Sequence, residues 1–283
     1  MTQALDELIS ILDLEQIEVN IFRGHSPDDK RNRVFGGQVA AQALTAAGRT
    51  VSIGNVHSLH SYFLRPGDVN IPILFEVDRI RDGKSFMTRR VVAIQNGEPI
   101  FNLSASFHKD EPGVSHQVSM PDVPDPLTLP TLRERVAPWA AQLGDWNLRL
   151  RPLDQRYIDP PNMEMYDEPR EPRQRVWLKA DGKLPNDPLL HACVVTYASD
   201  MTLLESAMMP HKFSWIDGNL MIASIDHVMW FHRPIKADQW FLYDQDSPTA
   251  AGARAFARGQ IFSYDGTLAV SVAQEGLLRV ITK

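Results

Sequence analysis

Two hydrophobic patterns recur along the chain. Several segments alternate apolar and polar residues with the two-residue period of a strand that has one buried face. Residues 73–80 are one such segment, and further runs form pairs around Asn96-Gly97 and Asp265-Gly266. These dipeptides are typical of type I′ hairpin turns, in which both central residues have positive φ. We therefore expect antiparallel strand pairs closed at these two places.

Residues 36–47 and 189–200 have the other pattern. Both segments are small or apolar on nearly every side of a helical wheel, so they are expected to form helices buried on several faces. Each is followed by a group of predicted strands. A mostly buried helix followed by antiparallel strands predicts an α+β fold, in which the sheet wraps the helix.

A short motif repeats together with this pattern. Residues 62–66 (Tyr-Phe-Leu-Arg-Pro) and 230–234 (Trp-Phe-His-Arg-Pro) share the order aromatic, Phe, any residue, Arg, Pro. Internal similarity of this kind indicates two similar units in tandem. The predicted architecture is therefore a duplication within one chain.

The composition changes between the two copies. Of the 20 prolines, 13 lie from Pro112 to Pro188, and proline is poorly tolerated inside regular elements. We predict an N-terminal unit at residues 1–118, a proline-rich linker at 119–147 and a C-terminal unit at 148–283. One helix is expected in the segment 130–144. Strands at 148–151 and 175–179 are expected to open the second unit.

Composition also limits the class of protein. The chain has 283 residues, 43% of them hydrophobic, and a formal net charge of −6, so it has no overall basic field to attract nucleic acid. Its single cysteine, Cys193, excludes an intramolecular disulfide framework and a cysteine-based zinc site.

No apolar run is long enough to span a membrane. The acidic first 19 residues predict an amphipathic helix rather than a signal peptide. The last residues do not match a peroxisomal Ser-Lys-Leu signal, and we predict a cytoplasmic protein.

Three separated blocks of the sequence resemble the acyl-CoA thioesterase II family. They are residues 197–200, 223–234 and 274–276, with further agreement at 35–38, 57–67 and 81–86. The resemblance covers nearly the whole chain. It implies a double hotdog fold, each half a helix wrapped by an antiparallel sheet, in agreement with the repeat. It also implies hydrolysis of acyl-CoA to a free acid and CoA, with medium- or long-chain fatty acyl-CoA as substrate and no metal or other cofactor.

Three functional residues carry over from the family by this resemblance, and all lie in the second unit. They are the acid Asp200, the hydroxyl residue Ser224, where family members have Thr or Ser, and the amide Gln274. Asp200 could accept a proton from the attacking water. Ser224 and Gln274 are neutral and can orient the water or the carboxylate without adding charge. We expect direct attack by water and an oxyanion held by backbone N–H groups, for which a helix N-terminus is one source.

Other residues with catalytic potential are expected to have structural roles. Asp226 and His227 are adjacent, so in a strand they point to opposite faces and do not form a dyad. His57, His60 and His232 lack metal-ligand spacing and are interpreted as packing residues. No Gly-x-Ser-x-Gly elbow supports a nucleophilic serine. Two other functions remain open, a non-catalytic acyl-CoA binding protein and a hotdog enoyl-CoA hydratase, which would need an Asp-His pair on one face.

Two further sets of residues could contact the substrate. Cations on the predicted strands could bind the CoA phosphates or form a solvated strand face; they are Arg79, Arg81, Lys84, Arg89, Arg90, Arg254 and Arg258. Apolar residues after Asp200 could line an acyl slot or pack in the core; they are Met201, Leu203, Leu204, Met208, Met209 and Phe213. Unpaired sheet edges and the family resemblance together predict a homo-oligomer, a dimer or a tetramer.

Overall fold

The computed structural model describes residues 2–27, 33–162, 164, 168–213 and 218–281. The strands of the first half are β1 (Glu15–Glu18), β2 (Ile21–Gly24), β3 (Asn55–Phe63), β4 (Ile73–Asp82), β5 (Phe86–Gln95) and β6 (Glu98–His108). Those of the second half are β7 (Leu153–Tyr157), β8 (Arg173–Ala180), β9 (Leu220–Ser224), β10 (Asp226–Phe231), β11 (Phe241–Ala251), β12 (Arg254–Ser263) and β13 (Leu268–Val280).

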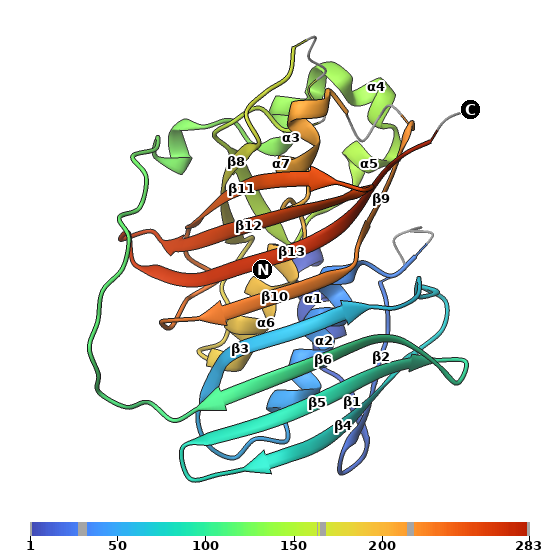
Figure 1. Ribbon diagram of the computed structural model, residues 1–283, viewed down its shortest axis with the longest axis vertical. Coiled ribbons are helices and arrows are strands. Elements are labelled where there is room, and N and C mark those ends of the chain that lie inside the picture. Colours follow the sequence, from blue (N-terminus) through green and yellow to red (C-terminus); the bar gives the residue numbers. More distant parts are fainter. Residues whose placement is uncertain (1, 28–32, 163, 165–167, 214–217, 282–283) are drawn as a thin grey trace.

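These strands form one continuous antiparallel sheet (Figure 1). Its order is β1-β2-β4-β5-β6-β3-β10-β13-β12-β11-β8-β7, and β9 pairs with one end of β13. The two halves join where β3 pairs with β10, with Leu59 opposite Met229. The repeated motif ends β3 and β10 at corresponding places, so the duplicated sequence builds the shared centre of the sheet.

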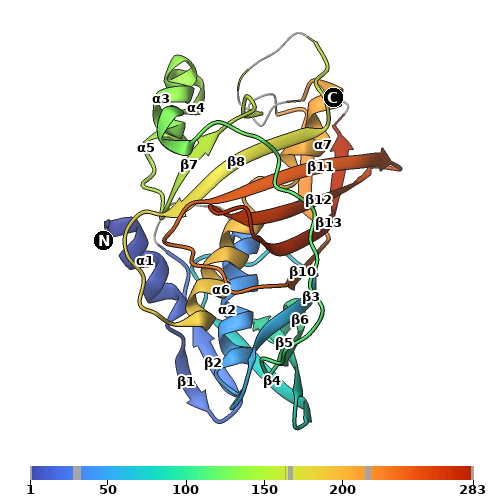
Figure 2. The same cartoon turned by 90° about the vertical axis from the view of Figure 1, so that its left-hand side faces the viewer.

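Three longer helices lie on one side of this sheet, which curves around them (Figure 2). They are α1 (Gln3–Leu12), α2 (Gly36–Gly48) and α6 (Pro188–Ser199). The predicted helices correspond to α2 and α6, which lie side by side. Every residue from 37 to 47 in α2 and from 191 to 199 in α6 is buried. Thr45 Oγ1 lies 3.2 Å from Cys193 Sγ between the two helices. The expected α+β arrangement of buried helices and a wrapping sheet is confirmed.

The two expected hairpins differ in their turns. Asn96 and Gly97 both have positive φ, at 52° and 78°, as a type I′ turn requires. In the second hairpin only Gly266 has positive φ, at 86°, and Asp265 does not. The type I′ prediction is therefore wrong there, because a longer loop at residues 264–267 joins the strands and Ser263 N donates to Thr267 O at 2.8 Å.

The strand expected at residues 148–151 is also absent. Leu148 ends the short helix α5 (Asp145–Leu148), and β7 begins only at Leu153. The Arg151 guanidinium lies 4.1 Å from the Trp146 ring centre and donates to the Trp146 carbonyl, so this segment is held against α5. The strand expected at 175–179 is confirmed as part of β8.

The proline-rich stretch contains short helical pieces instead of one helix at 130–144. They are η1 (Pro126–Thr128), α3 (Leu132–Val136), η2 (Ala137–Trp139) and α4 (Ala140–Leu143). Thr131 and Glu134 form a capping box that starts α3, and Pro138 lies in the 3₁₀ turn that interrupts the helix. The remaining short helices are α7 (Glu205–Met208) and η3 (Met209–His211).

The segment after β6 runs along the outer side of the second half (Figure 1). Trp177 Nε1 donates to Pro124 O at 3.0 Å, and Leu268 N donates to Gln117 Oε1 at 3.1 Å. Met120, Val123 and Leu129 cover an apolar cluster on that side. The linker therefore packs as part of the second half's structure. None of the described helices is both long enough and apolar enough to cross a membrane.

Candidate active site

The three side chains selected from the sequence meet at one carboxylate oxygen. Asp200 is the C-cap residue of α6, Ser224 is the last residue of β9, and Gln274 lies within β13. Ser224 Oγ donates a hydrogen bond to Asp200 Oδ1 at 3.2 Å, and Gln274 Nε2 donates to the same oxygen at 2.7 Å. Two neutral donors therefore hold one face of the carboxylate.

The first half of the chain contributes the N-terminus of α2. The Gly37 N–H, in the first turn, acts on the Asp200 carboxylate and lowers its pKa. Gly36 is the first residue of α2, and a Cβ at that position would lie 2.5 Å from Asp200 Oδ2. The absence of a side chain is required for this approach. The site is therefore built from both halves, whereas the three side chains found by resemblance all belong to the second.

Burial sets the acidity of Asp200. Removal from water raises the pKa of its carboxyl from 3.8 to about 6, and hydrogen bonds from Gln274, Ser224 and Gly37 oppose that rise. The residue remains partly exposed, on the wall of a pocket. A carboxylate with this pKa is mostly ionised at neutral pH and is a stronger base than an ordinary aspartate. Burial, together with the charge of Asp200, raises the pKa of the neighbouring Tyr243.

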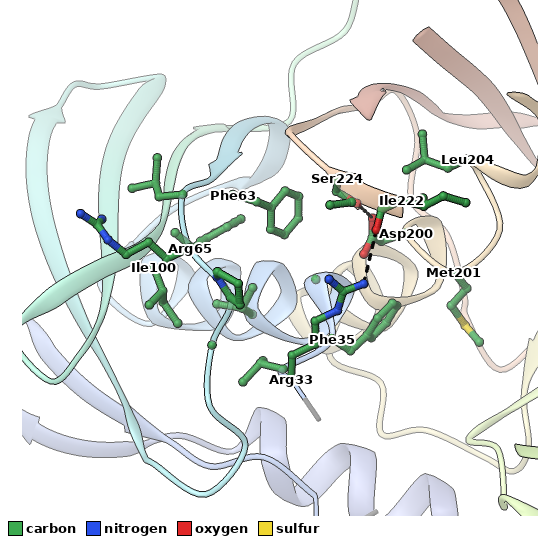
Figure 3. A pocket seen from close by; sticks show the side chains of 18 of the residues that line it. Arg33, Phe35, Phe63, Arg65, Ile100, Asp200, Met201, Leu204, Ile222 and Ser224 are labelled. Atoms are coloured by element: carbon green, nitrogen blue, oxygen red, sulfur yellow. Dashed lines mark hydrogen bonds between the residues drawn. The ribbon is translucent and has the colours of Figure 1, made fainter. Parts of the chain in front are cut away.

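The pocket in front of Asp200 has a volume of about 590 Å³ and takes walls from both halves. Phe35, Phe63 and Ile222 lie around Asp200 and Ser224 in Figure 3. Of the apolar residues selected after Asp200, Met201 and Leu204 line this pocket. The others do not line it; Leu203, Met208 and Met209 are buried inside the protein, in agreement with their alternative role in core packing.

The cations at this pocket are not those that the sequence suggested for CoA. Arg33 and Arg149 line it, and Arg33 reaches toward β9, where it donates to Ile222 O at 3.4 Å (Figure 3). Arg65 also lines it but points away from Asp200 and pairs with Glu98.

None of the cations suggested from the sequence is among the described residues that line the pocket of Asp200. Most of them pair with neighbouring acids: Arg89 with Asp82, Arg90 with Asp78, Arg254 with Glu275, and Arg258 with Asp246. Arg89 is buried, with 1% of its side chain exposed, because the Thr50 backbone and side chain also accept from its guanidinium. These four arginines therefore form ion pairs along the sheet.

A second pocket, of about 740 Å³, lies at the opposite ends of the same two helices. The repeat relates it to the first: Phe231-His232-Arg233-Pro234 lines it as residues 63–66 line the first pocket. Aligning the two copies on Thr45 and Thr196, which each donate to the carbonyl four residues earlier, places Arg49 where the other copy has Asp200. In the same way, the strand registers show that Val56 in the first copy is equivalent to Ser224 in the second, and that Ala105 is equivalent to Gln274. The second pocket therefore has no equivalent of the acid, hydroxyl and amide side chains that meet at the first pocket.

The remaining candidate residues are located as follows. Asp226 Oδ1 accepts from Glu275 N at 2.6 Å, while the His227 side chain is fully buried on the inner face of β10. The expected separation of this pair is observed, so it supplies no hydratase dyad. His57 contacts Ser106, His60 packs edge-on against Trp230, and His232 contacts Ser271. None of these three histidines lines the pocket of Asp200.

Comparison with known proteins agrees with this description. A family model described as acyl-CoA thioesterase matches residues 155–277, and one described as acyl-CoA thioesterase N-terminal domain matches residues 26–108. Human acyl-coenzyme A thioesterase 8 is 39% identical over 96% of this chain and 88% of its own length. The structure of acyl-CoA thioesterase II TesB2 from Mycobacterium marinum is 45% identical, with a TM-score of 0.80 over 98% of each chain. A hot dog fold protein from Alicyclobacillus acidocaldarius, 21% identical, has a TM-score of 0.79 over 100% of both chains.

The wrapped helices and the duplicated sheet therefore define a double hotdog protein, as the sequence predicted. The chain belongs to the acyl-CoA thioesterase family, a class of thioester hydrolases. Sequence reasoning found the three polar side chains through the family blocks. It missed Gly36, Gly37, Arg33 and Arg149, because their contribution depends on the packing of one half against the other.

Proposed function

We propose that the chain hydrolyses fatty acyl-CoA to a free fatty acid and CoA, with Asp200 as the general base for direct attack by water. One observation carries this proposal. Ser224 and Gln274 both donate to Asp200 Oδ1, while Oδ2 faces the N-terminus of α2 beside a pocket with apolar walls. The geometry supports a water held between the carboxylate and a thioester carbonyl.

The hydrolysis requires only the water, the thioester and Asp200 as the group that takes up and returns a proton. Asp200 takes a proton from the water as the water oxygen bonds to the carbonyl carbon, and the carbonyl oxygen becomes an oxyanion. The intermediate collapses by breaking the C–S bond, and the electron pair leaves with sulfur. Free thiols have a pKa near ~8.5, so the CoA thiolate can depart before it receives the proton from Asp200 or from solvent. Ser224 and Gln274 keep the base oriented throughout.

The oxyanion needs donors that are already in place. The first turn of α2 offers N–H groups that have no intrahelical acceptor, and the positive end of the helix dipole adds to their effect. Gly36 and Gly37, the first two residues of this turn, lie beside the Asp200 carboxylate. We assign oxyanion stabilisation to this turn.

The activity should depend on pH through Asp200. The base must be ionised, so kcat/KM for acyl-CoA should rise with pH, with a midpoint at about 6, and level off above it. An ordinary exposed aspartate would put this limb roughly two pH units lower. The measurement is kcat/KM from pH 4.5 to 8.5 with enzyme shown to be stable at each pH. A rate that stays constant down to pH 4.5 would contradict a base whose pKa is raised to about 6.

Arg33 and Arg149 at the pocket supply a place for the phosphates of CoA. The protein's net charge of −6 repels an anion, so local cations must bind it. Arg33 and Arg149 line the pocket that holds Asp200, and guanidinium groups bind phosphate strongly. The acyl chain would extend along the apolar walls formed by residues such as Phe35, Phe63 and Ile222.

Charge removal at these positions should affect binding and leave the chemistry intact. We expect Arg33→Gln and Arg149→Gln each to raise KM for acyl-CoA about 5- to 30-fold, as the loss of one charge-assisted hydrogen bond does, with kcat nearly unchanged. Hydrolysis of the same acyl group on N-acetylcysteamine, which has no phosphate, should be unaffected. Arg258→Gln, at an outer ion pair with Asp246, is the matched control. Equal losses with both substrates would place these arginines outside the CoA site.

A thiol-release assay over acyl-CoA of increasing chain length tests the proposed substrate class. Release of CoA that rises with acyl length and then levels off supports the fatty acyl assignment. Binding of acyl-CoA without thiol release would instead establish a non-catalytic binding protein. Loss of the enoyl absorbance band without thiol release would establish a hydratase.

We also propose a homo-oligomer, a dimer or a tetramer, and the three-part division at 1–118, 119–147 and 148–283. The terminal strands β1 and β7 support association, because the ends of a sheet need partners or cover. The matches at residues 26–108 and 155–277 support the division. The cytoplasm is the proposed location, in keeping with the free thiol of the buried Cys193.

A further inference from the structure

Two buried polar atoms next to the active site are unsatisfied. His227 and Gln274 are 0% and 1% exposed. Val228 on β10 is opposite Ala273 on β13, so the next pair along this antiparallel register is His227 and Gln274. Within the described part of the chain, neither His227 Nδ1 nor Gln274 Oε1 has a hydrogen-bond partner. Unsatisfied buried polar atoms are rare in folded proteins and require an explanation.

The other polar ends of these two side chains are fixed. Gln274 Nε2 donates to Asp200 Oδ1 at 2.7 Å. His227 Nε2 lies 2.8 Å from the hydroxyl of Ser199, which directly precedes Asp200. The Ser199 carbonyl in turn accepts from Tyr243 at 3.0 Å. The imidazole and the amide are therefore each anchored by one polar atom, and the other polar atom of each is unsatisfied.

The two side chains already influence each other electrostatically. Burial lowers the pKa of His227 to about 4, and the Gln274 side chain opposes this change. Stabilisation of the protonated imidazole is the effect expected of the amide oxygen, which accepts, and not of the amide nitrogen, which donates. His227 is neutral at physiological pH, so only one of its ring nitrogens carries a proton.

We propose that His227 is a positioning residue for Gln274: its Nδ1–H donates to Gln274 Oε1 and so holds the amide with Nε2 toward Asp200. This inference rests on the proposed function of Asp200. It assigns the Nδ1–H tautomer, in which Nε2 accepts the proton of the Ser199 hydroxyl in preference to that hydroxyl's other acceptor, the Thr196 carbonyl at 2.9 Å. Ser199, His227 and Gln274 then form a continuous chain of hydrogen bonds that ends at the base.

The physical reason is the ambiguity of a glutamine side chain. An amide can be turned by half a rotation, which would bring Oε1 against the Asp200 carboxylate, where two acceptor oxygens repel. An N–H donor on the far side removes that alternative, because only Oε1 can accept from it. His227 is not among the residues that line the Asp200 pocket. It would act on the reaction only through Gln274.

Two substitutions separate the two ring nitrogens. The amide of His227→Asn places an N–H near the position of Nδ1, whereas that of His227→Gln reaches the position of Nε2. We expect His227→Asn to keep kcat within about threefold of the wild type. His227→Gln should lose 10- to 100-fold in kcat, the range typical when a supporting hydrogen-bond partner is removed, with KM for acyl-CoA nearly unchanged.

The pH profile distinguishes positioning from a loss of stability. The bond from Gln274 lowers the pKa of Asp200, so His227→Gln should move the limb of kcat/KM upward from about pH 6 and His227→Asn should not. The other ionisable groups that act on or share a pocket with Asp200 are Tyr243, Glu205, Arg33, Arg65 and Arg149. Neither substitution changes them. In a Gln274→Ala background, His227→Gln should cause no further loss of kcat.

The tautomer itself can be measured without any turnover. ¹⁵N-labelled histidine in the intact protein reports by NMR which ring nitrogen of His227 carries the proton, and we expect Nδ1–H. An Nε2–H tautomer would overturn the proposal, as would equal kcat values and equal pH profiles for the two variants, or a full His227→Gln effect in the Gln274→Ala background. If the proposed hydrolysis fails while the tautomer is Nδ1–H, the positioning geometry stands and only the role of Asp200 is rejected.

Discussion

Replacing Asp200 with asparagine is expected to lower kcat for acyl-CoA hydrolysis by about 10²–10⁴-fold, the usual contribution of a general base. Asparagine keeps an oxygen that can accept from Ser224 Oγ and Gln274 Nε2, so the local structure should persist. What it lacks is the ability to take a proton from water. The measurement is thiol release under saturating acyl-CoA, with KM recorded separately to show that substrate still binds.

Asp200→Asn should also raise the free energy of unfolding. This increase can be measured alongside kcat, and it would show that the variant is folded. In the unfolded chain Asp200 ionises near its ordinary pKa of 3.8, and in the folded chain near about 6. Between these values the folded state binds more protons, so the contribution of Asp200 to stability falls as pH rises. Asparagine does not titrate. Asp200→Asn should therefore gain stability relative to the wild type from about pH 4 to about pH 6, and the gain should stay constant above that.

A folded Asp200→Asn protein with the wild-type rate would reject the proposed mechanism. The positions that the repeat relates to Asp200, Ser224 and Gln274 could not replace this group, because they hold Arg49, Val56 and Ala105. The stability comparison then has a further use. A difference in melting temperature that does not vary with pH would show that Asp200 is not held at a raised pKa.

Gly36→Ala is the substitution with the second largest expected effect. The new methyl carbon would lie 2.5 Å from Asp200 Oδ2 and 2.9 Å from the Phe63 ring. The carboxylate must move, and misplacement of a catalytic group by about 1 Å can reduce the rate about 10²-fold. We expect kcat to fall by this order. The measurement is thiol release at saturating acyl-CoA, with the melting temperature recorded in parallel.

Gly113→Ala is a suitable control, because a Cβ there meets nothing within 4 Å. It should leave both kcat and stability close to wild type. A fall in kcat for Gly36→Ala that is accompanied by a large fall in melting temperature would point to damage of the α2–α6 packing instead of the catalytic geometry. Wild-type activity in Gly36→Ala would contradict the close approach of α2 to Asp200.

The fold could be predicted from the sequence where an element has a clear hydrophobic pattern of its own. The helices at 36–47 and 189–200 are apolar on nearly all sides, and the strands alternate, so the two wrapped helices followed directly. The predictions that were wrong rest on short sequence patterns, where local contacts in the folded chain determine the conformation instead. Arg151 stacks on Trp146 and removes the expected strand at 148–151, and the loop at residues 264–267 gives Asp265-Gly266 a turn other than type I′.

The site was predictable only in part, for a related reason. Asp200, Ser224 and Gln274 are recognisable because they lie in blocks that resemble a family. The closeness of Gly36 to Asp200, and of His227 to Gln274, depends on which strand and helix ends meet after folding. The arginines show the same limit: a cluster in the sequence suggested Arg79 to Arg90, whereas the folded chain brings Arg33 and Arg149 to the pocket.

The central claim, that water activated by Asp200 attacks the thioester directly, is tested most directly by oxygen isotope transfer in a single turnover. Enzyme in excess over acyl-CoA is allowed to react in H₂¹⁸O, and the fatty acid and the peptide containing Asp200 are analysed by mass spectrometry. The mechanism predicts ¹⁸O in the fatty acid and none in Asp200. A fatty acid without ¹⁸O, together with ¹⁸O in the Asp200 carboxylate, would show that Asp200 attacks the thioester itself and would contradict the account.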